Sequence, residues 1–225
     1  MIRYHRDLIQ GSDEWLAARC GLLTASEMKL IVTPTLKIAS NDKQRAHLWE
    51  LLAQRITRYV EPGYFNDDML RGQEDEIEAV ALYDQHYAPV DTTVGFITND
   101  GMGFTLGCSP DGLVGEDGMI ECKSRRQRFQ AELLVTREIP PEHLIQLQTA
   151  MFVAGRAWVD YVSYCGGMPM VTIRLLPDEA MVVAIRDAAS AFEARLKVAV
   201  AEYADGLVLL RTIPTTRRIE QEMHL

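Results

Sequence analysis

Several stretches of the chain have apolar and polar residues spaced as in helices that lie against a core. Residues three and four positions apart are neighbours on a helix, so this spacing gathers the apolar side chains on one face. The longest stretches predict helices over 41–60, 68–87, 141–154 and 178–203. Pro62-Gly63 is expected to end the first, and Pro141 to begin the third.

Two shorter helices are expected near the N-terminus. Ser12 can accept a hydrogen bond from a free amide at a helix start, and two acidic residues follow it, where the helix dipole favours negative charge. Gly21 is expected to close this helix. A second start follows, with Ser26 as the expected cap.

Between the second and third long helices the pattern changes to short apolar runs separated by turn residues. Runs of this kind predict strands over 94–98, 104–108, 119–123, 158–164 and 170–175. Asp117-Gly118 is a strong turn signal, so 104–123 is expected to form a hairpin or meander. The predicted fold is α/β, with a central mixed β-sheet flanked by helices in a single domain over 1–225.

Composition agrees with one globular unit. The 225 residues are 48% hydrophobic, enough for one sizeable core and too few for two complete domains. No apolar run is long enough for a membrane helix, and the N-terminus lacks the apolar core of a signal peptide, so we expect a cytosolic protein. The four cysteines lack the paired spacing of a zinc or iron–sulfur site, which favours reduced structural thiols.

The net charge of −9 restricts the choice of partners. A nucleic acid can still bind an acidic protein if basic residues are concentrated at the docking surface. Two clusters offer this concentration: Arg125, Arg126 and Arg128, and Arg3, His5 and Arg6. Each cluster is equally well interpreted as an ordinary solvated face.

The residues that suggest chemistry are Asp111, Glu121 and Lys123. Side chains of a strand alternate between its two faces, so Glu121 and Lys123 point to one side and Cys122 to the other. A hairpin that turns within 115–118 brings Asp111 back beside Glu121. Two carboxylates and one ammonium are therefore expected on one face. An ordinary surface hairpin with a Glu–Lys pair is the alternative.

Such a group can bind a cation and act on a phosphodiester. Paired carboxylates repel each other unless a proton or a cation lies between them, and magnesium prefers oxygen ligands. Asp111, Glu121 and the backbone carbonyl of Cys122 form a possible magnesium site. A bound metal lowers the pKa of its water, and Lys123 could hold or deprotonate that water and neutralise the developing charge.

Pro110-Asp111 followed by Glu121-Cys122-Lys123 matches the PD-(D/E)XK nuclease signature. The surrounding chain resembles the phage lambda-type exonuclease family, also called YqaJ-like viral recombinases. Four further segments carry this resemblance over about residues 10–158: Gln10-Gly11-Ser12-Asp13-Glu14-Trp15, the segment 19–27, Gly72-Gln73-Glu74-Asp75-Glu76 and Gln146-Leu147-Gln148.

The resemblance implies an activity and its setting. Members are magnesium-dependent 5′→3′ exonucleases that digest linear double-stranded DNA to mononucleotides and leave a 3′ single-stranded tail. They use two ions, for which manganese can substitute. The family also implies a homotrimer around DNA, a single-strand annealing protein as partner in phage-type recombination, and the cytoplasm of a bacterial host cell, with no membrane.

The resemblance assigns further site residues. Glu76 lies four residues after Gly72 and is preferred over Glu78 as the acid near the metals. Gln146 is expected at the attacking water or the scissile phosphate. Arg19 and Ser26 match the binding site for a 5′-terminal phosphate, and a hydroxyl at a helix start beside an arginine suits an anion. The alternative for these two is a capped helix and a surface arginine.

Some roles stay open. Met69 matches an apolar residue that separates bases at the duplex end, although a methionine near a helix start is more often core. His143 shares a helix face with Gln146, and it can serve the site or only solvate the helix. After Lys123 the chain reads Ser124-Arg125-Arg126, which departs from the family pattern.

Two other functions compete with the exonuclease. One is a site-specific or repair endonuclease of the same superfamily, against which an end-binding pocket argues. The other is an inert clamp on DNA ends, against which the complete set of Asp111, Glu121 and Lys123 argues.

Overall fold

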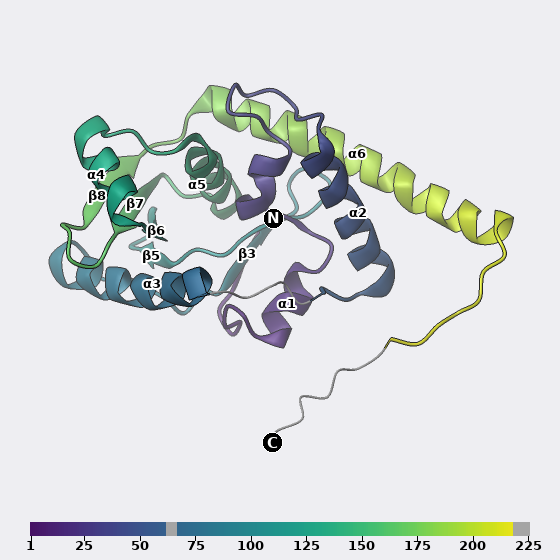
Figure 1. Ribbon diagram of the computed structural model, residues 1–225, viewed down its shortest axis with the longest axis horizontal. Helices are drawn as coiled ribbons and strands as arrows, with labels where there is room; N and C mark the ends of the chain where they lie inside the picture. Colours follow the sequence, from purple (N-terminus) through teal and green to yellow (C-terminus); the bar gives the residue numbers. More distant parts are fainter. Residues whose placement is uncertain (62–66, 218–225) are drawn as a thin grey trace, which may run out of the picture.

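A computed structural model describes residues 1–61 and 67–217 of the chain (Figure 1). The helices are α1 (Asp13–Arg19), the 3-10 helix η1 (Ala25–Leu30), α2 (Asp42–Thr57), α3 (Asp67–His86), α4 (Gln127–Thr136), α5 (Pro141–Ala154) and α6 (Glu179–Leu209). The strands are β1 (Ile2–His5), β2 (Leu23–Thr24), β3 (Phe96–Asn99), β4 (Leu106–Cys108), β5 (Gly112–Val114), β6 (Gly118–Ser124), β7 (Trp158–Tyr164) and β8 (Val171–Leu175). No helix among these residues is long and apolar enough to cross a membrane.

The strands form two mixed sheets of four strands, in the orders β1-β3-β4-β2 and β5-β6-β7-β8. In the second sheet β6 runs parallel to β7 and antiparallel to β5, and β7 runs antiparallel to β8. The fold class predicted from the sequence is confirmed, with the strands divided between two sheets where one was expected.

The two faces of the second sheet are covered by different helices. On one face, Ile120 and Cys122 pack with Ala79 and Tyr83 of α3. On the other, Met119 and Tyr161 belong to the larger core that α5 and α6 complete. Neighbouring residues of β6 therefore face different helices, as strand geometry requires. In Figure 1, α3 and α5 lie on opposite sides of β5 and β6.

Several helix boundaries were predicted correctly because their capping residues are visible in the sequence. The Ser12 side chain accepts from the amide of Trp15 at 3.2 Å, as expected for the cap of α1. Pro141 is the first residue of α5, and Gly155 follows its last turn with φ of 64°, a conformation that favours glycine.

Three predicted boundaries were wrong. Thr24, and not Ser26, caps η1, because Thr24 has the extended backbone of a cap and exchanges hydrogen bonds with Glu27. α2 ends at Thr57, where Arg58 takes a left-handed conformation, before Pro62-Gly63, which lie outside the described residues. α6 continues to Leu209, beyond the predicted end at 203.

Four elements were not predicted: β1, β2, α4 and β5. β1 pairs with β3, which lies more than 90 positions further along the chain. α4 begins soon after the end of β6. β5 was expected to be a connection, but it is the partner of β6 in the predicted hairpin. The strand over 106–108 belongs to the other sheet. All four cysteines are free, as expected.

α3 is attached to the second sheet at two points. The Tyr83 hydroxyl donates to Oδ2 of buried Asp160 on β7 at 2.6 Å, and Arg174 donates to both oxygens of Asp160 at 2.8 Å. Nearer the start of α3, Ser124 donates to Asp75 at 2.5 Å. These contacts fix the turns of α3 that lie between them.

We expect Tyr83→Phe to lower the free energy of unfolding at pH 7 by about 1–3 kcal/mol, because the buried Asp160 carboxylate loses a donor. Burial and the hydrogen bond to Asp160 raise the pKa of Tyr83 above its ordinary value. A raised folded pKa gives stability that is present below the unfolded pKa of about 10 and is lost as pH rises further. The difference between variant and parent should therefore shrink above about pH 10.

Urea unfolding at pH 7 and above pH 10 measures this difference. Tyr203→Phe is the matched control, because Tyr203 is exposed on α6. Equal stability of Tyr83→Phe and the parent protein at pH 7 would contradict the assignment of this attachment.

Candidate active site

A cavity of about 210 Å³ brings together the residues that the sequence singled out. It lies where α3, β6, α5 and the segment from α1 to η1 meet. Its lining is Gln10, Trp15, Arg19, Thr24, Ala25, Ser26, Glu76, Phe96, Cys108, Ser109, Asp111, Glu121, Lys123, Gln146 and Ala150. Every predicted catalytic side chain is in this set, and so are both residues of the predicted phosphate pocket.

The β5–β6 hairpin places Asp111 beside Glu121. Gly112 pairs with Ile120, so the residues before and after this pair stand opposite each other. The amide of Cys122 donates to Oδ2 of Asp111 at 2.5 Å. The N–H and C=O of one strand residue point the same way, so the Cys122 carbonyl is expected on the Asp111 side as well.

Glu121 is buried and has two donors on one oxygen. Lys123 Nζ and Gln146 Nε2 each lie 2.5 Å from Oε1 of Glu121. Lys123 follows two residues later on the same face of β6, as predicted, while Gln146 comes from α5. The second glutamine of the Gln-x-Gln segment lies away from the acids, where Gln148 bonds the carbonyl of Leu176 and the amide of Asp178, before α6.

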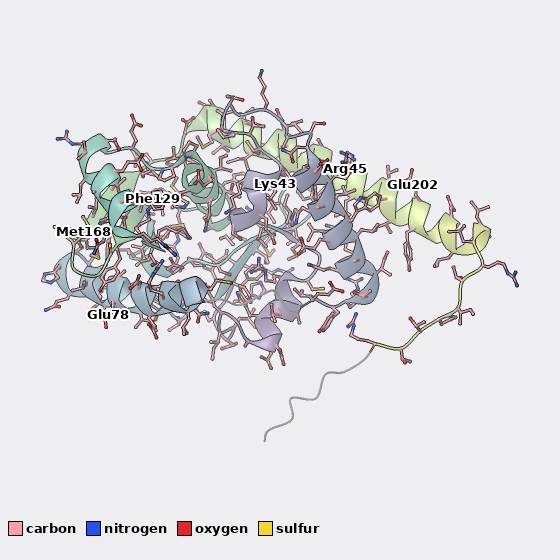
Figure 2. All side chains as sticks on the ribbon, in the orientation of Figure 1. Lys43, Arg45, Glu78, Phe129, Met168 and Glu202 are labelled. Atoms are coloured by element: carbon pink, nitrogen blue, oxygen red, sulfur yellow. The ribbon has the colours of Figure 1, made fainter. Side chains whose placement is uncertain are left out.

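Glu76 is the third acid of the cavity. It comes from α3, and its carboxyl group lies close enough to Glu121, Lys123 and Asp111 for their charges and polar groups to shift its pKa. Glu78, the alternative that spacing left open, is exposed on α3 and does not line the cavity (Figure 2). The helix therefore directs Glu76, and not Glu78, toward Asp111 and Glu121.

The acids repel one another in this position. Burial, and then the negative charges of Glu121 and Glu76, raise the pKa of Asp111 well above its usual range. Burial and Glu121 likewise raise the pKa of Glu76. Because both shifts reflect the cost of negative charge here, a proton or a bound cation would stabilise the group.

Lys123 supplies the nearest positive charge. Burial acts against its ammonium, but the carboxylates, Glu121 first, raise its pKa above the ordinary value. Lys123 is therefore an ammonium in this arrangement. His143 donates to or accepts from Tyr161 at 3.1 Å, and burial together with the charges of Lys123, Arg125 and Lys29 lowers the pKa of His143 to about 3. At neutral pH His143 is thus uncharged.

The donor set suits an oxygen-seeking cation. In the described part of the chain, no three acidic, histidine or cysteine side chains already stand in a coordinating arrangement. The Asp111 and Glu121 oxygens face N–H donors of Cys122, Lys123 and Gln146. The carboxyl groups of Glu76, Asp111 and Glu121 line one cavity, and magnesium prefers oxygen donors of this kind.

The other end of the cavity is cationic. Arg19 lies over the ring of Trp15, 4.4 Å from its centre, and donates to Thr24 Oγ1 at 3.2 Å. Trp15 in turn donates to Ser109 Oγ at 2.9 Å. Ser26 is exposed at the mouth of the cavity, with its hydroxyl 3.2 Å from Thr24 Oγ1. A guanidinium and several hydroxyls thus share one wall.

Trp15, Thr24, Ser109 and Gln10 line the cavity but were not predicted as site residues. Ser109 could have been found, because it directly precedes the Pro-Asp pair. Trp15 lies in a segment that the resemblance had already matched. Gln10 donates to the carbonyl of Pro110 at 3.2 Å, a long-range contact that no local pattern indicates.

The remaining predicted residues lie outside the cavity. Met69 is 48% exposed near the start of α3, so it is not a core residue. Arg125 and Arg128 lie over Phe129 of α4, 4.9 and 4.3 Å from its ring centre. In the N-terminal cluster, Arg6 is paired with Asp91 at 2.8 Å.

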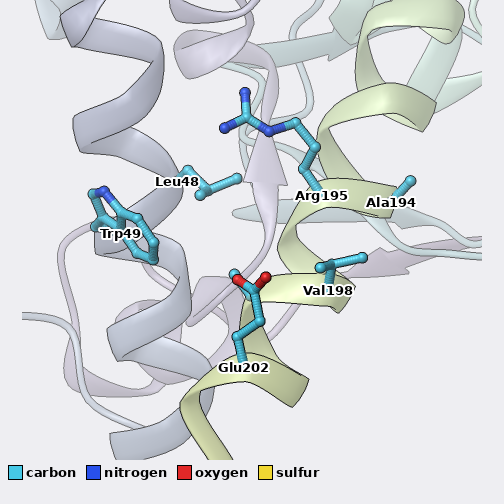
Figure 3. A pocket seen from close by; sticks show the side chains of 7 residues that line it. Leu48, Trp49, Ala194, Arg195, Val198 and Glu202 are labelled. Carbon is cyan, nitrogen blue, oxygen red and sulfur yellow. The ribbon is translucent and has the colours of Figure 1, made fainter. Parts of the chain in front are cut away.

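A second cavity, of about 410 Å³, lies between α2 and α6 (Figure 3). It is lined by Leu48, Trp49, Ala194, Arg195, Val198, Ala199 and Glu202. A single carboxylate and a single guanidinium on mostly apolar walls provide no group of catalytic acids. The smaller cavity is therefore the candidate active site.

Comparison with known proteins identifies the family of the chain. An alkaline exonuclease from Laribacter hongkongensis, LHK-Exo, is 32% identical and covers 89% of this chain and 100% of its own, with a TM-score of 0.78. The structure of LHK-Exo in complex with dAMP is 33% identical, with a TM-score of 0.79, and again covers 89% of this chain and 100% of its own. A phage-related exonuclease from Haemophilus somnus 129PT, 12% identical, shares the fold with a TM-score of 0.61 over 81% of this chain and 96% of its own.

No curated protein matches the chain significantly. The model of the YqaJ-like viral recombinase domain matches residues 14–157, which include α1, the hairpin and α5. This match spans most of the chain and contains every residue of the acidic group. The chain therefore belongs to the YqaJ-like viral recombinase family.

Proposed function

We propose that this protein is a magnesium-dependent 5′→3′ exonuclease that digests linear double-stranded DNA to mononucleotides and leaves a 3′ single-stranded tail. The observation that carries the proposal is one cavity lined both by the acids and by Arg19 with Ser26. LHK-Exo supports nuclease activity, since it is an exonuclease that is about a third identical to this chain.

Asp111, Glu121 and the Cys122 carbonyl are the proposed ligands of two magnesium ions, for which manganese would substitute. Bound magnesium would supply a hydroxide at neutral pH and stabilise negative charge on the phosphoryl oxygens. Glu76, which lines the same cavity as Asp111 and Glu121, would complete the acidic wall.

The other residues position the reactants. The Lys123 ammonium can hold the attacking water and neutralise charge that develops on the phosphodiester. Gln146 contacts Glu121 through its Nε2, so its amide is placed to orient water or the scissile phosphate. His143 is uncharged at neutral pH and bonded to Tyr161, which suits support of α5 rather than contact with an anion.

Arg19 and Ser26 are proposed to bind the 5′-terminal phosphate. Arginine offers a fork of donors that matches a phosphate, and hydroxyl groups add further donors. An end-binding pocket that shares a cavity with the acids restricts cleavage to nucleotides near the terminus. LHK-Exo has been crystallised with dAMP, a nucleoside monophosphate, which supports release of mononucleotides.

The proposed setting follows from the family. The protein would form a homotrimer around DNA, act with a single-strand annealing protein, and work in the cytoplasm of a bacterial host. A ring would place basic residues such as Arg125, Arg126 and Arg128 on an inner wall, which would reconcile DNA binding with a net charge of −9. Met69, 48% exposed near the start of α3, is the proposed wedge at the duplex end.

We expect Asp111→Asn and Glu121→Gln each to reduce the rate of duplex digestion with magnesium by about 10²–10³-fold or more, since each removes a charged ligand. Asp111→Asn should unfold at the same or a higher temperature, because it removes a repelled carboxyl group. Glu78→Gln is the matched control. Near-parent rates in either site variant would refute the assignment.

We expect Arg19→Ala to reduce the preference for a 5′-phosphate over a 5′-hydroxyl end by about tenfold or more, as when a charged hydrogen-bond partner is lost. The measurement is kcat/KM on two duplexes that differ only in that phosphate. Arg45→Ala, an exposed arginine of α2, is the control (Figure 2). An unchanged preference in Arg19→Ala would mean that the phosphate binds elsewhere.

A covalently closed circle distinguishes the competing functions. An enzyme that needs an end leaves the circle intact and digests the same DNA once it is linearised. Cutting of the circle would favour the endonuclease. A linear 5′-phosphorylated duplex that survives with magnesium would favour the inert clamp.

A further inference from the structure

A carboxylate lies directly behind the proposed phosphate pocket. Oε1 of Glu27 is 3.6 Å from Nη2 of Arg19. Oε2 of Glu27 accepts from the amide and the hydroxyl of Thr24, at 3.2 and 2.7 Å. These contacts hold Arg19 and Thr24 in place. A negative charge here would also repel a phosphate, unless a nearby group offsets it.

His47 of α2 is placed to offset this charge. Its side chain is 2% exposed, and Nε2 lies 3.8 Å from Oε2 of Glu27. Nδ1 lies 3.0 Å from Oε2 of Glu50, and the ring stacks on Phe192. Each ring nitrogen of His47 therefore faces a carboxylate, and an imidazole N–H dipole directed at a carboxylate partly offsets its negative charge.

The capping of η1 does not account for this histidine. Thr24 and Glu27 complete their reciprocal hydrogen bonds without it. Among the described residues Nε2 of His47 has no hydrogen-bond partner, although it is buried. Buried polar nitrogens of this kind need an explanation, and the nearest charged group is Glu27.

The same helix holds the turn after Arg19. The Gly21 amide donates to Oε1 of Gln54 at 2.8 Å, and Arg55 donates to the Gly21 carbonyl at 2.8 Å. α2 thus contacts the pocket residues from behind at the turn after α1 and at Glu27. Two buried polar residues of α2, His47 and Gln54, therefore face residues of this pocket or of the turn beside it.

We propose that Glu27 and His47 form a positioning pair for the terminal-phosphate pocket. Glu27 holds Arg19 and Thr24, and His47 offsets the negative charge that Glu27 would otherwise present to the phosphate. The pair makes the enzyme more selective for phosphorylated 5′ ends. This inference rests on the proposed function of Arg19 and Ser26.

The test is the ratio of kcat/KM for a 5′-phosphate duplex to kcat/KM for the matching 5′-hydroxyl duplex, with magnesium present. Inactive or misfolded molecules lower both values equally, so they cancel in the ratio. His47→Leu should lower the ratio by about tenfold, the size expected when a charged group loses its partner. His47→Gln, whose amide can donate to Glu27, should keep the ratio closer to that of the parent.

A double variant tests the charge argument separately. In Glu27→Gln/His47→Leu the carboxylate next to Arg19 is gone, while the glutamine amide oxygen can still accept from Arg19 and Thr24, so the ratio should recover relative to His47→Leu alone. A ratio as low as in the single variant would overturn the proposal. Gln44→Leu is the matched control, because it removes another buried polar side chain of α2 that contacts Arg195 rather than Glu27.

Arg19→Ala, measured in parallel, separates the two levels of the argument. If Arg19→Ala lowers the ratio and His47→Leu does not, the pocket stands and the positioning pair is wrong. If Arg19→Ala leaves the ratio unchanged, the pocket itself is wrong and the pair falls with it.

Discussion

The antiparallel register of β5 and β6 is the constraint on which the rest of the site depends. It sets Asp111 opposite Glu121 and lets the Cys122 amide bond the Asp111 carboxylate. Because side chains alternate along a strand, Glu121 and Lys123 point toward α5, whereas Cys122 points toward α3. A strand with this pattern has one polar face that only a site can use, because burying such a face in a core would cost several kcal/mol for each unpaired charge.

The helices above and below β6 complete the site from opposite directions. α3 brings Glu76, and its position is fixed by Tyr83 at one end and Asp75 at the other. α5 brings Gln146 and is held by His143 on Tyr161, the residue of β7 that pairs with Glu121. The free energy of these hydrogen bonds and of the surrounding packing holds the three acids together against their mutual repulsion. Stability stored in the packing thus offsets the repulsion of charge concentrated at one point, as is common in active sites.

Much of this arrangement could be predicted from local signals. The hairpin follows from Asp117-Gly118, and α5 from the proline at its start and the glycine after its end. The acids and Lys123 follow from the spacing across that hairpin. β1 could not be predicted, because it is short and its pairing with β3 joins residues almost a hundred positions apart. Ser26 was predicted to cap η1, but Thr24 is the capping residue. Both side chains can cap a helix, and the backbone conformation that distinguishes them cannot be predicted from the sequence. The contact of His47 with Glu27 could not be predicted either, because it depends on how α2 packs against η1.

The turn between β5 and β6 has a consequence for how this family can vary. Arg156, which follows α5, donates to the carbonyls of Gly115 and Glu116, and Ala157 bonds the carbonyl of Asp117. Surface loops usually tolerate added residues, but the length of this loop sets the register that places Asp111 opposite Glu121. One inserted residue that shifted the pairing would exchange the faces of β6 and turn Cys122 inward in place of Glu121. Evolution of new loops in such proteins is therefore expected to avoid this hairpin and to concentrate in connections that do not determine strand register.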